Sequence, residues 1–427
     1  MNINLGNDKN NNNIYSINDT LKMKENMISE KEKKKNEEKN KINLKKENED
    51  IILPPLFFKK YKPINKISQG SCSVIYEGKN INTNEKVAIK IEQKEENENE
   101  LLKREICFLY LLRNCPGIVK IISFGETKNF YVLIEPLLGK SLFSLFLESN
   151  KNFNIKDICL IAIQCLDRLE SVHSKGIIHC DIKPENLAIG YNDKRFIYLL
   201  DFGLSKKYRS DRTKNHIQFS ITKTMTGTAR YASTNALSGL QLSRRDDLES
   251  LSYVILYFLT KRLPWQGIEA KTLASRYLKI FNKKMELEKW EKFKKIPLQI
   301  QNFIKYCRSL RFAQDPDYKK MKDYFYNLME ELKIENDGNF SWIIDKSIIG
   351  SSMPNDFKKK KYCSVIKIRK RLTNSILCLK SNPKSGRNKE AKKANSPSNN
   401  IRIKKNENDF KDEYSNSIIG VFNDELE

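Results

Sequence analysis

Two short segments of this 427-residue chain carry side chains that can take part in phosphoryl transfer. They span residues 179–186 (HCDIKPEN) and 201–203 (DFG). Together they supply two carboxylates, an ammonium and an amide: Asp181, Lys183, Asn186 and Asp201. Phosphoryl transfer from ATP requires such groups, because phosphate charge must be neutralised and the attacking hydroxyl must lose a proton. Alone, Asp-Phe-Gly is usually a turn, so the joint occurrence of the two segments is what indicates this chemistry.

The neighbouring residues predict the elements that position these groups. Residues 196–200 (FIYLL) form an apolar run that predicts a buried strand, which would deliver Asp201 to a cleft. Residues 85–91 (EKVAIKI) predict a second strand, which contains Lys90, although such a stretch is common in strands. Apolar residues at helical spacing between 101 and 112 predict a helix that can present Glu105 to Lys90.

These segments resemble the motifs of protein kinases. The resemblance implies an α+β, two-lobed protein-kinase fold, with a small β-rich N-terminal lobe and a larger α-helical C-terminal lobe. It implies that Asp181 accepts the proton of the attacking hydroxyl and that Lys183 stabilises the transferring phosphoryl group. Asn186 and Asp201 would hold Mg²⁺.

The same resemblance implies an ATP site between the lobes. Lys90 would pair with the α- and β-phosphates, and Glu105 would hold the lysine in place. Ile134 and Glu135 are interpreted as the hinge that binds adenine through its backbone. The residues implied to bind ATP are Ile67, Gly70, Ile75, Ala88, Lys90, Glu105 and Glu135.

The phosphate-binding loop departs from the kinase pattern. Where G-x-G-x-x-G is expected, residues 68–73 read SQGSCS and retain only Gly70. Glycine matters there because backbone N–H groups must approach the phosphates without a Cβ in the way. With Ser68 and Ser73 in place of glycine, we expect weaker or slower handling of ATP, and not its loss.

Segments further along the chain resemble casein kinase 1. Four of them carry the likeness: residues 226–233 (TGTARYAS), 243–250 (SRRDDLES), 263–267 (LPWQG) and 306–312 (YCRSLRF). The likeness runs from about residue 60 to 342, with the motifs in the family order. As in that family, Ala-Pro-Glu is missing after the activation segment, where the chain has Ser233-Thr-Asn235.

This second resemblance implies a monomeric Ser/Thr protein kinase that prefers acidic or pre-phosphorylated protein substrates. The implied phosphate-binding residues are Arg230, Gly267, Arg276 and Lys223. Arginine at 276 replaces the usual lysine, and its planar guanidinium suits phosphate well. Each of these cations could instead be an ordinary solvated surface charge. Asp247 matches a buried carboxylate that supports the catalytic loop.

Two further positions differ from the family pattern. Cys180 stands where an arginine usually precedes the catalytic aspartate, so a second anion site should be weaker, with Lys206 as its remaining contributor. We expect this thiol to be buried and inert. The hinge stretch Glu135–Gly139 is interpreted as one residue longer than in the family.

The composition predicts a folded core between two polar ends. Residues 1–50 are dominated by Asn, Lys and Glu and are predicted to be disordered. Residues 56–345 form the predicted kinase domain, with the N-terminal lobe at about 56–134 and the C-terminal lobe at about 138–345. Residues 346–427 form a basic, Ser-rich tail that we predict to be largely disordered.

The charge favours anionic partners. Residues 51–345 contain 48 Lys and Arg against 34 Asp and Glu, so the core contributes +14 to the net charge of +25. An acidic or phosphorylated protein and nucleic acid both remain candidates on charge alone. The basic tail between residues 358 and 405 suits nuclear import, nucleic acid or an anionic membrane, and equally a solvated segment.

The cysteines and the apolar runs predict the compartment. Nine cysteines include no C-x-x-C pair, and the three histidines show no metal-ligand spacing, so we expect reduced thiols in an intracellular protein. No apolar run approaches the ~20 residues needed to span a bilayer. We expect the protein in the cytoplasm, the nucleus or both.

Two other functions remain open at this point. The first is a pseudokinase scaffold that phosphorylates nothing, which Ser68, Ser73 and Cys180 favour and the complete catalytic set opposes. The second is a nucleic-acid-binding protein, which rests on charge alone and lacks a recognised fold or stacking motif. We therefore expect protein substrates and not nucleic acid.

Overall fold

The computed structural model describes residues 53–70, 72–94, 101–222 and 224–343. The predicted disordered segment 1–50 and the predicted tail 346–427 lie outside these ranges. Within them, no helix combines the length and the apolar character needed to cross a membrane.

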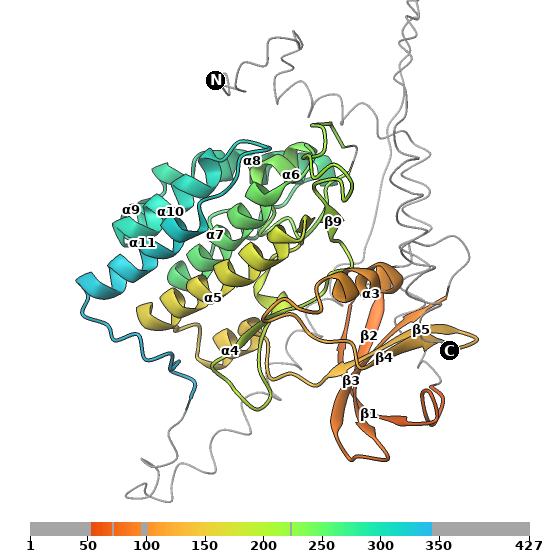
Figure 1. Ribbon diagram of the computed structural model, residues 1–427. Coiled ribbons are helices and arrows are strands. Elements are labelled where there is room, and N and C mark those ends of the chain that lie inside the picture. Colours follow the sequence, from red (N-terminus) through yellow and green to blue (C-terminus); the bar gives the residue numbers. More distant parts are fainter. Residues whose placement is uncertain (1–52, 71, 95–100, 223, 344–427) are drawn as a thin grey trace, which may run out of the picture. The chain divides into compact units, whose positions relative to one another are not determined.

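The N-terminal part of the described chain is an antiparallel sheet with the strand order β1-β2-β3-β5-β4 (Figure 1). The strands are β1 (Tyr61–Gln69), β2 (Ser73–Asn80), β3 (Lys86–Gln93), β4 (Ser123–Glu126) and β5 (Phe130–Pro136). The helix α3 (Leu101–Leu111) packs against β3 and β5, which confirms the predicted helix near residue 105.

Alternation along β3 and β5 gives this sheet two different faces. One face packs into an apolar core that contains Val87, Ile89, Ile91, Val132 and Ile134. In the antiparallel register, Ala88 is opposite Glu135 and Lys90 is opposite Leu133. These four residues therefore share the other face of the sheet.

The C-terminal part is mainly helical. Its longer helices are α5 (Ile155–Ser174), α7 (Arg244–Thr260), α8 (Leu273–Met285), α10 (Leu298–Ser309) and α11 (Tyr318–Glu331). The shorter ones are α4 (Leu142–Glu148), α6 (Thr234–Ser238), α9 (Glu291–Lys294) and the 3₁₀ turns at Pro184–Asn186 (η1) and Leu287–Lys289 (η2). Figure 1 shows α5, α7, α10 and α11 side by side, away from the sheet. This arrangement confirms the two-lobed α+β fold.

The central helix α7 is buried on almost all sides, as expected for a helix in the core of a lobe. Its first turn nevertheless contains acidic residues, because a capping box joins Ser243 to Asp246 and satisfies N–H groups that have no partner inside the helix. The next residue, Asp247, is likewise buried. The charged end of α7 is therefore fixed inside the lobe, where it can contact other backbone segments.

Two short antiparallel strand pairs hold the segments that carry the catalytic groups. β6 (Ile177–Ile178) ends directly before His179 and pairs with β9 (Lys206–Lys207). β7 (Leu187–Ile189) starts directly after Asn186 and pairs with β8 (Ile197–Leu199). β8 confirms the buried strand predicted before Asp201, which follows it by two residues. Both ends of residues 179–186 are thus anchored to strands.

Candidate active site

Lys90 on β3 is the centre of a buried ion-pair network. Its Nζ lies 2.5 Å from Glu105 Oε2 on α3 and 3.3 Å from Asp201 Oδ1. Burial by itself would lower the pKa of Lys90, but the charges of Glu105 and Asp201 outweigh burial and raise the pKa above its usual value. The ammonium therefore stays charged and joins the sheet, α3 and the DFG segment.

Two further contacts hold α3 in this position. The Glu92 carboxylate on β3 accepts hydrogen bonds from the N–H groups of Leu101 and Leu102, which satisfies donors that have no partner inside the helix. Arg104 Nη2 donates to the Ser205 carbonyl at 3.0 Å, just beyond the DFG segment. Glu105 therefore follows a residue that is bonded to the other lobe.

The Asp181 carboxylate is held by side chains and backbone from two segments. Lys183 Nζ lies 2.5 Å from its Oδ2. Thr228 donates to Oδ1 from its backbone N–H at 2.9 Å and from its hydroxyl at 2.8 Å. Asn186 Nδ2 donates to the Asp181 carbonyl at 3.0 Å. A carboxylate oriented in this way is prepared to accept a proton from a substrate hydroxyl.

Asp247 supports the catalytic segment from inside the C-terminal lobe. Its carboxylate accepts hydrogen bonds from the backbone N–H groups of His179 at 2.7 Å and Cys180 at 2.8 Å, and it contacts His173 Nε2 at 2.9 Å. The other ring nitrogen of His173 contacts the Tyr318 hydroxyl on α11 at 2.5 Å. Burial would raise the pKa of Asp247, but the hydrogen bond and charge of His173 together with the charge and backbone N–H of His179 outweigh burial and lower the pKa.

The backbone around these groups adopts conformations that side chains usually disfavour. Cys180 has φ 70° and Asp201 has φ 67°, both in the left-handed region. Gly227 has φ 89°, and a Cβ there would lie 2.5 Å from the Cys180 carbonyl oxygen. Only glycine at this position lets the turn approach closely enough for Thr228 to reach Asp181.

The immediate neighbours of Asp181 are packed. Burial raises the pKa of the Cys180 thiol well above its usual value, although the residue is partly exposed and not fully buried as predicted. The His179 ring lies edge-on to Phe202, with ring centroids 4.9 Å apart, and its Nε2 contacts the Leu200 carbonyl at 2.9 Å. Lys206, predicted to contribute to a second anion site, donates to the Thr226 hydroxyl at 3.4 Å.

The side chains around Asp201 fit Mg²⁺ and the phosphates of ATP. The Asp201 side chain is 45% exposed, and its Oδ1 is the atom that Lys90 contacts. The amide nitrogen of Asn186 is used by Asp181, which leaves the amide oxygen for a ligand. Carboxylate and amide oxygens are suitable Mg²⁺ ligands. Burial opposes ionisation of Asp201, but the charges of Lys90, His179 and Lys183 together outweigh burial and keep the pKa of this carboxyl below its usual value.

The other residues implied to bind ATP lie on the same face of the sheet or at its edge. Ile75 on β2 is opposite Lys90, so Ile75, Ala88 and Lys90 share one face. Ile67 lies at an irregularity of the β1–β2 pairing and is 50% exposed. The Gly70 N–H donates to the Ser73 carbonyl at 2.8 Å, which closes the loop.

The structure differs from the sequence-based interpretation around Glu135. β5 continues through Pro136, so Ile134 and Glu135 lie inside the strand, and the connection to the C-terminal lobe starts at residue 137. Pro136 pairs with Val87 of β3 in the last pair of the ladder, a position where proline is tolerated. Glu135 and Pro136, the first two residues of the stretch interpreted as a lengthened hinge, therefore belong to β5. The Glu135 side chain lies on the Lys90 face of the sheet.

Glu135 should make stability depend on pH. Burial, together with the nearby charge of Glu105, raises the pKa of Glu135 to about 8. The folded protein then keeps a proton that the unfolded chain releases near pH 4.5, so stability falls as the pH rises from about 4.5 to about 8, above which the loss is complete. Glu135→Gln should remove this loss and be more stable than the wild type at pH 9, by roughly 1–2 kcal/mol.

Thermal melts at pH 6 and pH 9 test this expectation. The difference in Tm between Glu135→Gln and the wild type should increase from pH 6 to pH 9. Glu126→Gln, an exposed glutamate on β4, is the control and should show no such change. A difference in Tm that is the same at both pH values would contradict the raised pKa of Glu135.

The implied phosphate-binding residues lie on segments that the structure joins. Trp265 Nε1 donates to the Arg230 carbonyl at 2.7 Å, and Gly267 follows Trp265 in a turn with φ 79°. Arg276 lies on α8. This helix packs against α6, which begins shortly after Arg230 in the sequence. The side chains of Arg230 and Arg276 are exposed. Lys223 lies outside the described residues.

Three residues with contacts at these sites were not singled out from the sequence: Thr228, Arg104 and Lys284. Thr228 belongs to the TGTARYAS motif, which indicated a resemblance to casein kinase 1 but no contact with Asp181. Its partner Asp181 is 47 residues away, so no spacing signal links the two. Arg104 is adjacent to Glu105, and a positive neighbour on a helix is too common to attract attention.

Removing the Thr228 hydroxyl should slow phosphoryl transfer. Thr228→Val keeps the shape and the backbone hydrogen bond but removes one of the donors that orient Asp181. Because a hydrogen bond to a charged group is worth about 1.5–3 kcal/mol, we expect kcat to fall at least about tenfold. Thr222→Val, in the same segment, is the control. An unchanged kcat for Thr228→Val would contradict the orienting role.

A comparison with known families agrees with this geometry. The family described as "Protein kinase domain" matches residues 61–324, which is more than half of the chain and includes the sheet, the catalytic segment and most of the helical lobe. The matched range contains Lys90, Glu105, Asp181, Asn186 and Asp201, the groups that the structure gathers between the lobes. The chain therefore belongs to the protein kinase family.

Proposed function

We propose that this protein is an active Ser/Thr kinase of the casein kinase 1 type, which transfers the γ-phosphate of ATP to acidic or phosphate-primed protein substrates. One observation carries the proposal. Lys90 contacts both Glu105 and Asp201 while the Asp181 carboxylate is oriented by Lys183 and Thr228. The groups for binding phosphate and for accepting a proton are thus assembled together, as catalysis by positioning requires.

Each of these groups has a definite task in the transfer. Asp181 accepts the proton of the attacking Ser or Thr hydroxyl, and Lys183 neutralises charge on the moving phosphoryl group. Lys90 binds phosphate oxygens of ATP, and Glu105 keeps the lysine in place. Mg²⁺, which Asn186 and Asp201 would hold, supplies further neutralisation of phosphate charge.

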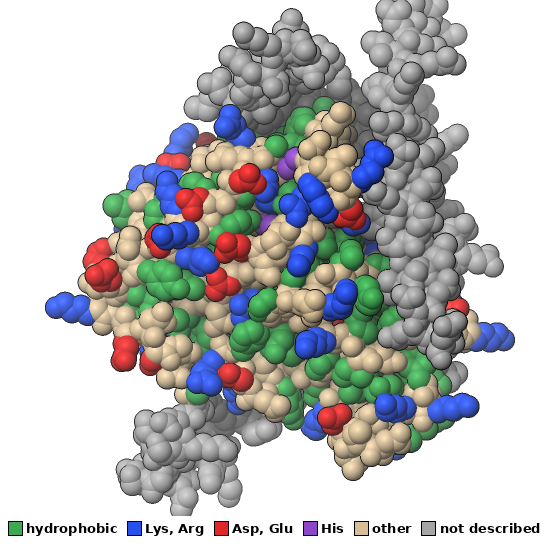
Figure 2. All heavy atoms as spheres, in the orientation of Figure 1, with side chains coloured by type: hydrophobic (Ala, Val, Ile, Leu, Met, Phe, Trp, Pro, Cys, Tyr) green, Lys and Arg blue, Asp and Glu red, His purple; other side chains and the backbone are tan. Residues whose placement is uncertain are grey.

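The surface of the kinase domain supports the substrate preference. Arg230 is exposed, and no carboxylate lies within ion-pair distance of it in the described parts of the chain. An arginine without an acidic partner remains available for a phosphate or a carboxylate of a substrate. Figure 2 shows Lys and Arg side chains spread over one face of the molecule among Asp and Glu side chains, and residues 51–345 carry a net charge of +14.

Transfer of labelled phosphate from Mg-ATP to two peptides tests the proposal. The peptides differ only in a phosphoserine three residues before the target serine. We expect faster transfer to the primed peptide, and Arg230→Ala should reduce this preference while Arg311→Ala, another exposed arginine, should not. Equal transfer to both peptides would agree with kinase activity but contradict a phosphate-binding role for Arg230.

A pseudokinase scaffold is the second candidate function. Ser68, Ser73 and Cys180, which replace residues of the family pattern, favour it. The ion pair between Lys90 and Glu105 opposes it, because a scaffold has no need to align phosphates. Absence of transfer to either peptide, with ATP binding shown separately, would decide for the scaffold.

A further inference from the structure

Lys284 on α8 is a fully buried lysine that the phosphoryl-transfer chemistry does not use. Its Nζ donates to the backbone carbonyls of Ala229 at 3.0 Å and Ala232 at 2.5 Å. The same Nζ lies over the rings of Tyr253 and Trp265, at 4.6 and 5.0 Å from the ring centroids. Burying an ammonium costs free energy unless it is paired, so these contacts offset a real penalty.

The carbonyls that Lys284 holds lie on either side of Arg230. Trp265 fixes the Arg230 carbonyl between them through its indole N–H. Further along the same segment, the Glu249 carboxylate accepts a hydrogen bond from the Thr234 N–H at 2.8 Å. Three buried side chains, Lys284, Trp265 and Glu249, therefore hold the backbone of residues 229–234, while the Arg230 side chain is left exposed. The Thr234 hydroxyl adds a contact to Glu249 at 3.3 Å.

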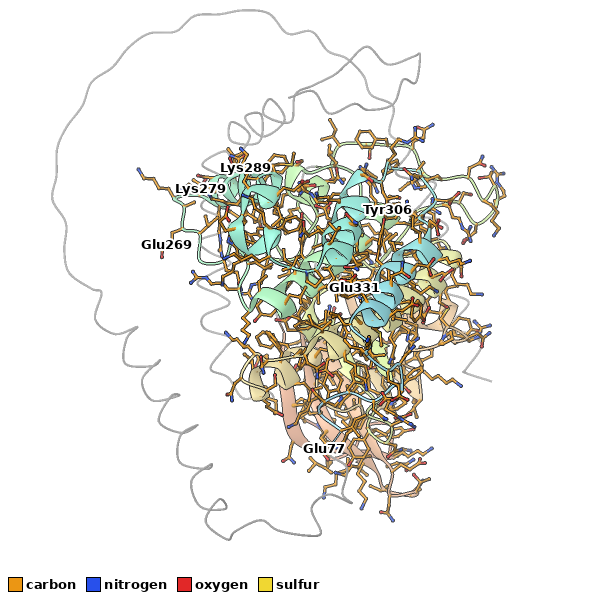
Figure 3. All side chains as sticks on the ribbon, turned by 90° about the vertical axis from the view of Figure 1, so that its left-hand side faces the viewer. Glu77, Glu269, Lys279, Lys289, Tyr306 and Glu331 are labelled. Atoms are coloured by element: carbon orange, nitrogen blue, oxygen red, sulfur yellow. The ribbon has the colours of Figure 1, made fainter. Side chains whose placement is uncertain are left out.

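The helix that carries Lys284 also carries Arg276, eight residues earlier and about 12 Å along the helix axis. A second contact fastens this helix: Lys279 Nζ donates to the Glu269 carbonyl at 3.0 Å, two residues beyond Gly267. Figure 3 shows Lys279 and Glu269 next to each other at the surface. α8 is thus bonded to the Gly267 segment at one point and to the Arg230 segment at another.

We propose that Lys284 is a positioning residue for recognition of a substrate phosphate. By bonding the backbone on both sides of Arg230 to α8, it fixes Arg230 relative to Arg276, so that two guanidinium groups can bind one anion. The inference rests on the proposed function, because it concerns the primed substrate. Lys284 can act in either protonation state, since a neutral amine still has N–H donors for the two carbonyls.

Burial disfavours the charged form of Lys284. Burial lowers its pKa to about 7, with the Glu249 carboxylate counteracting and Arg308 adding to the shift. Removing the ammonium relieves the cost of burying a charge but leaves the carbonyls of Ala229 and Ala232 without their donor. Lys284→Met should therefore lower Tm modestly and disturb the Arg230 segment.

Steady-state kinetics with the peptide pair test the inference. For Lys284→Met, we expect KM for the primed peptide to rise about tenfold, the effect of losing about 1.4 kcal/mol of binding. The kcat for the unprimed peptide should change by less than about twofold. Lys284→Gln, whose amide can donate to a carbonyl, should recover part of the preference. Lys283→Met is the matched control, because Lys283 lies on the same helix with its side chain 56% exposed.

The outcomes separate this inference from the proposed function. An unchanged preference in Lys284→Met, with a clear preference in the wild type, would overturn the inference alone. An equal loss of kcat on both peptides would indicate a general structural role and overturn it too. A wild type that transfers phosphate without preference would overturn the inference and the proposed substrate preference, but not the kinase activity.

Hydrogen–deuterium exchange gives a readout that does not depend on activity. The amides of residues 229–234 should exchange faster in Lys284→Met than in the wild type or in Lys283→Met. Equal exchange in the three proteins would overturn the inference whatever the peptides show.

Discussion

Asp181→Asn should reduce phosphoryl transfer about 10³-fold while ATP still binds. The substitution keeps the size of the side chain and can keep a hydrogen bond to Thr228, but an amide cannot accept the proton of the attacking hydroxyl. Proton transfer to a positioned base typically contributes a factor of 10²–10⁴. Because the residues implied to bind ATP lie mainly in the other lobe, the Kd for ATP should change little.

Single-turnover transfer of labelled phosphate, together with ATP binding by calorimetry, measures both quantities. Asp193→Asn is a suitable control, since Asp193 lies in an exposed turn of the same lobe. Transfer by Asp181→Asn at a rate near that of the wild type would exclude Asp181 as the catalytic base. Loss of ATP binding as well would point instead to a disturbed fold.

Lys90→Met should produce the second large effect. The substitution removes the ammonium that contacts Glu105 and Asp201 and leaves both carboxylates without their shared partner. We expect kcat/KM for ATP to fall about 10²–10³-fold, which corresponds to about 3–4 kcal/mol of transition-state stabilisation. Part of the loss should appear as a higher KM, because the lysine also binds ATP in the ground state.

The same strand offers a matched control. Lys86 also lies on β3 and forms an ion pair, with Glu77 at 2.9 Å, but its side chain is 52% exposed (Glu77 is labelled in Figure 3). Exposed pairs of this kind contribute little. Lys86→Met should therefore leave kcat/KM for ATP unchanged. Similar losses in both variants would mean that charge on β3 in general, and not the buried pair, supports activity.

Much of the fold and of the site could be predicted because the signals are local. The run at 196–200 indicated the strand before Asp201, and the apolar spacing at 101–112 indicated the helix that carries Glu105. Neither prediction required knowledge of a partner. The resemblance to kinases then supplied the pairing of Lys90 with Glu105, which the structure shows directly.

Other features depend on contacts between distant residues. The partners of Lys284 are 52 and 55 residues away, and the register of β5 against β3 decides which way Glu135 faces. A lysine followed by methionine near a helix end gives no sign that it is buried. The N-terminal lobe was expected to end at about residue 134, whereas β5 continues to Pro136.

Glu135 has a consequence for compounds designed to block this kinase. Its side chain lies on the sheet face that also carries Ala88 and Lys90, so the wall beside the implied nucleotide site bears a carboxyl group on β5. A compound that places an amine against this wall should gain a charge-assisted hydrogen bond. One that places a large apolar group there should bind less tightly, since it would remove water from the carboxyl. A compound with such an amine should therefore bind this protein more tightly than a kinase that has an apolar residue at this position.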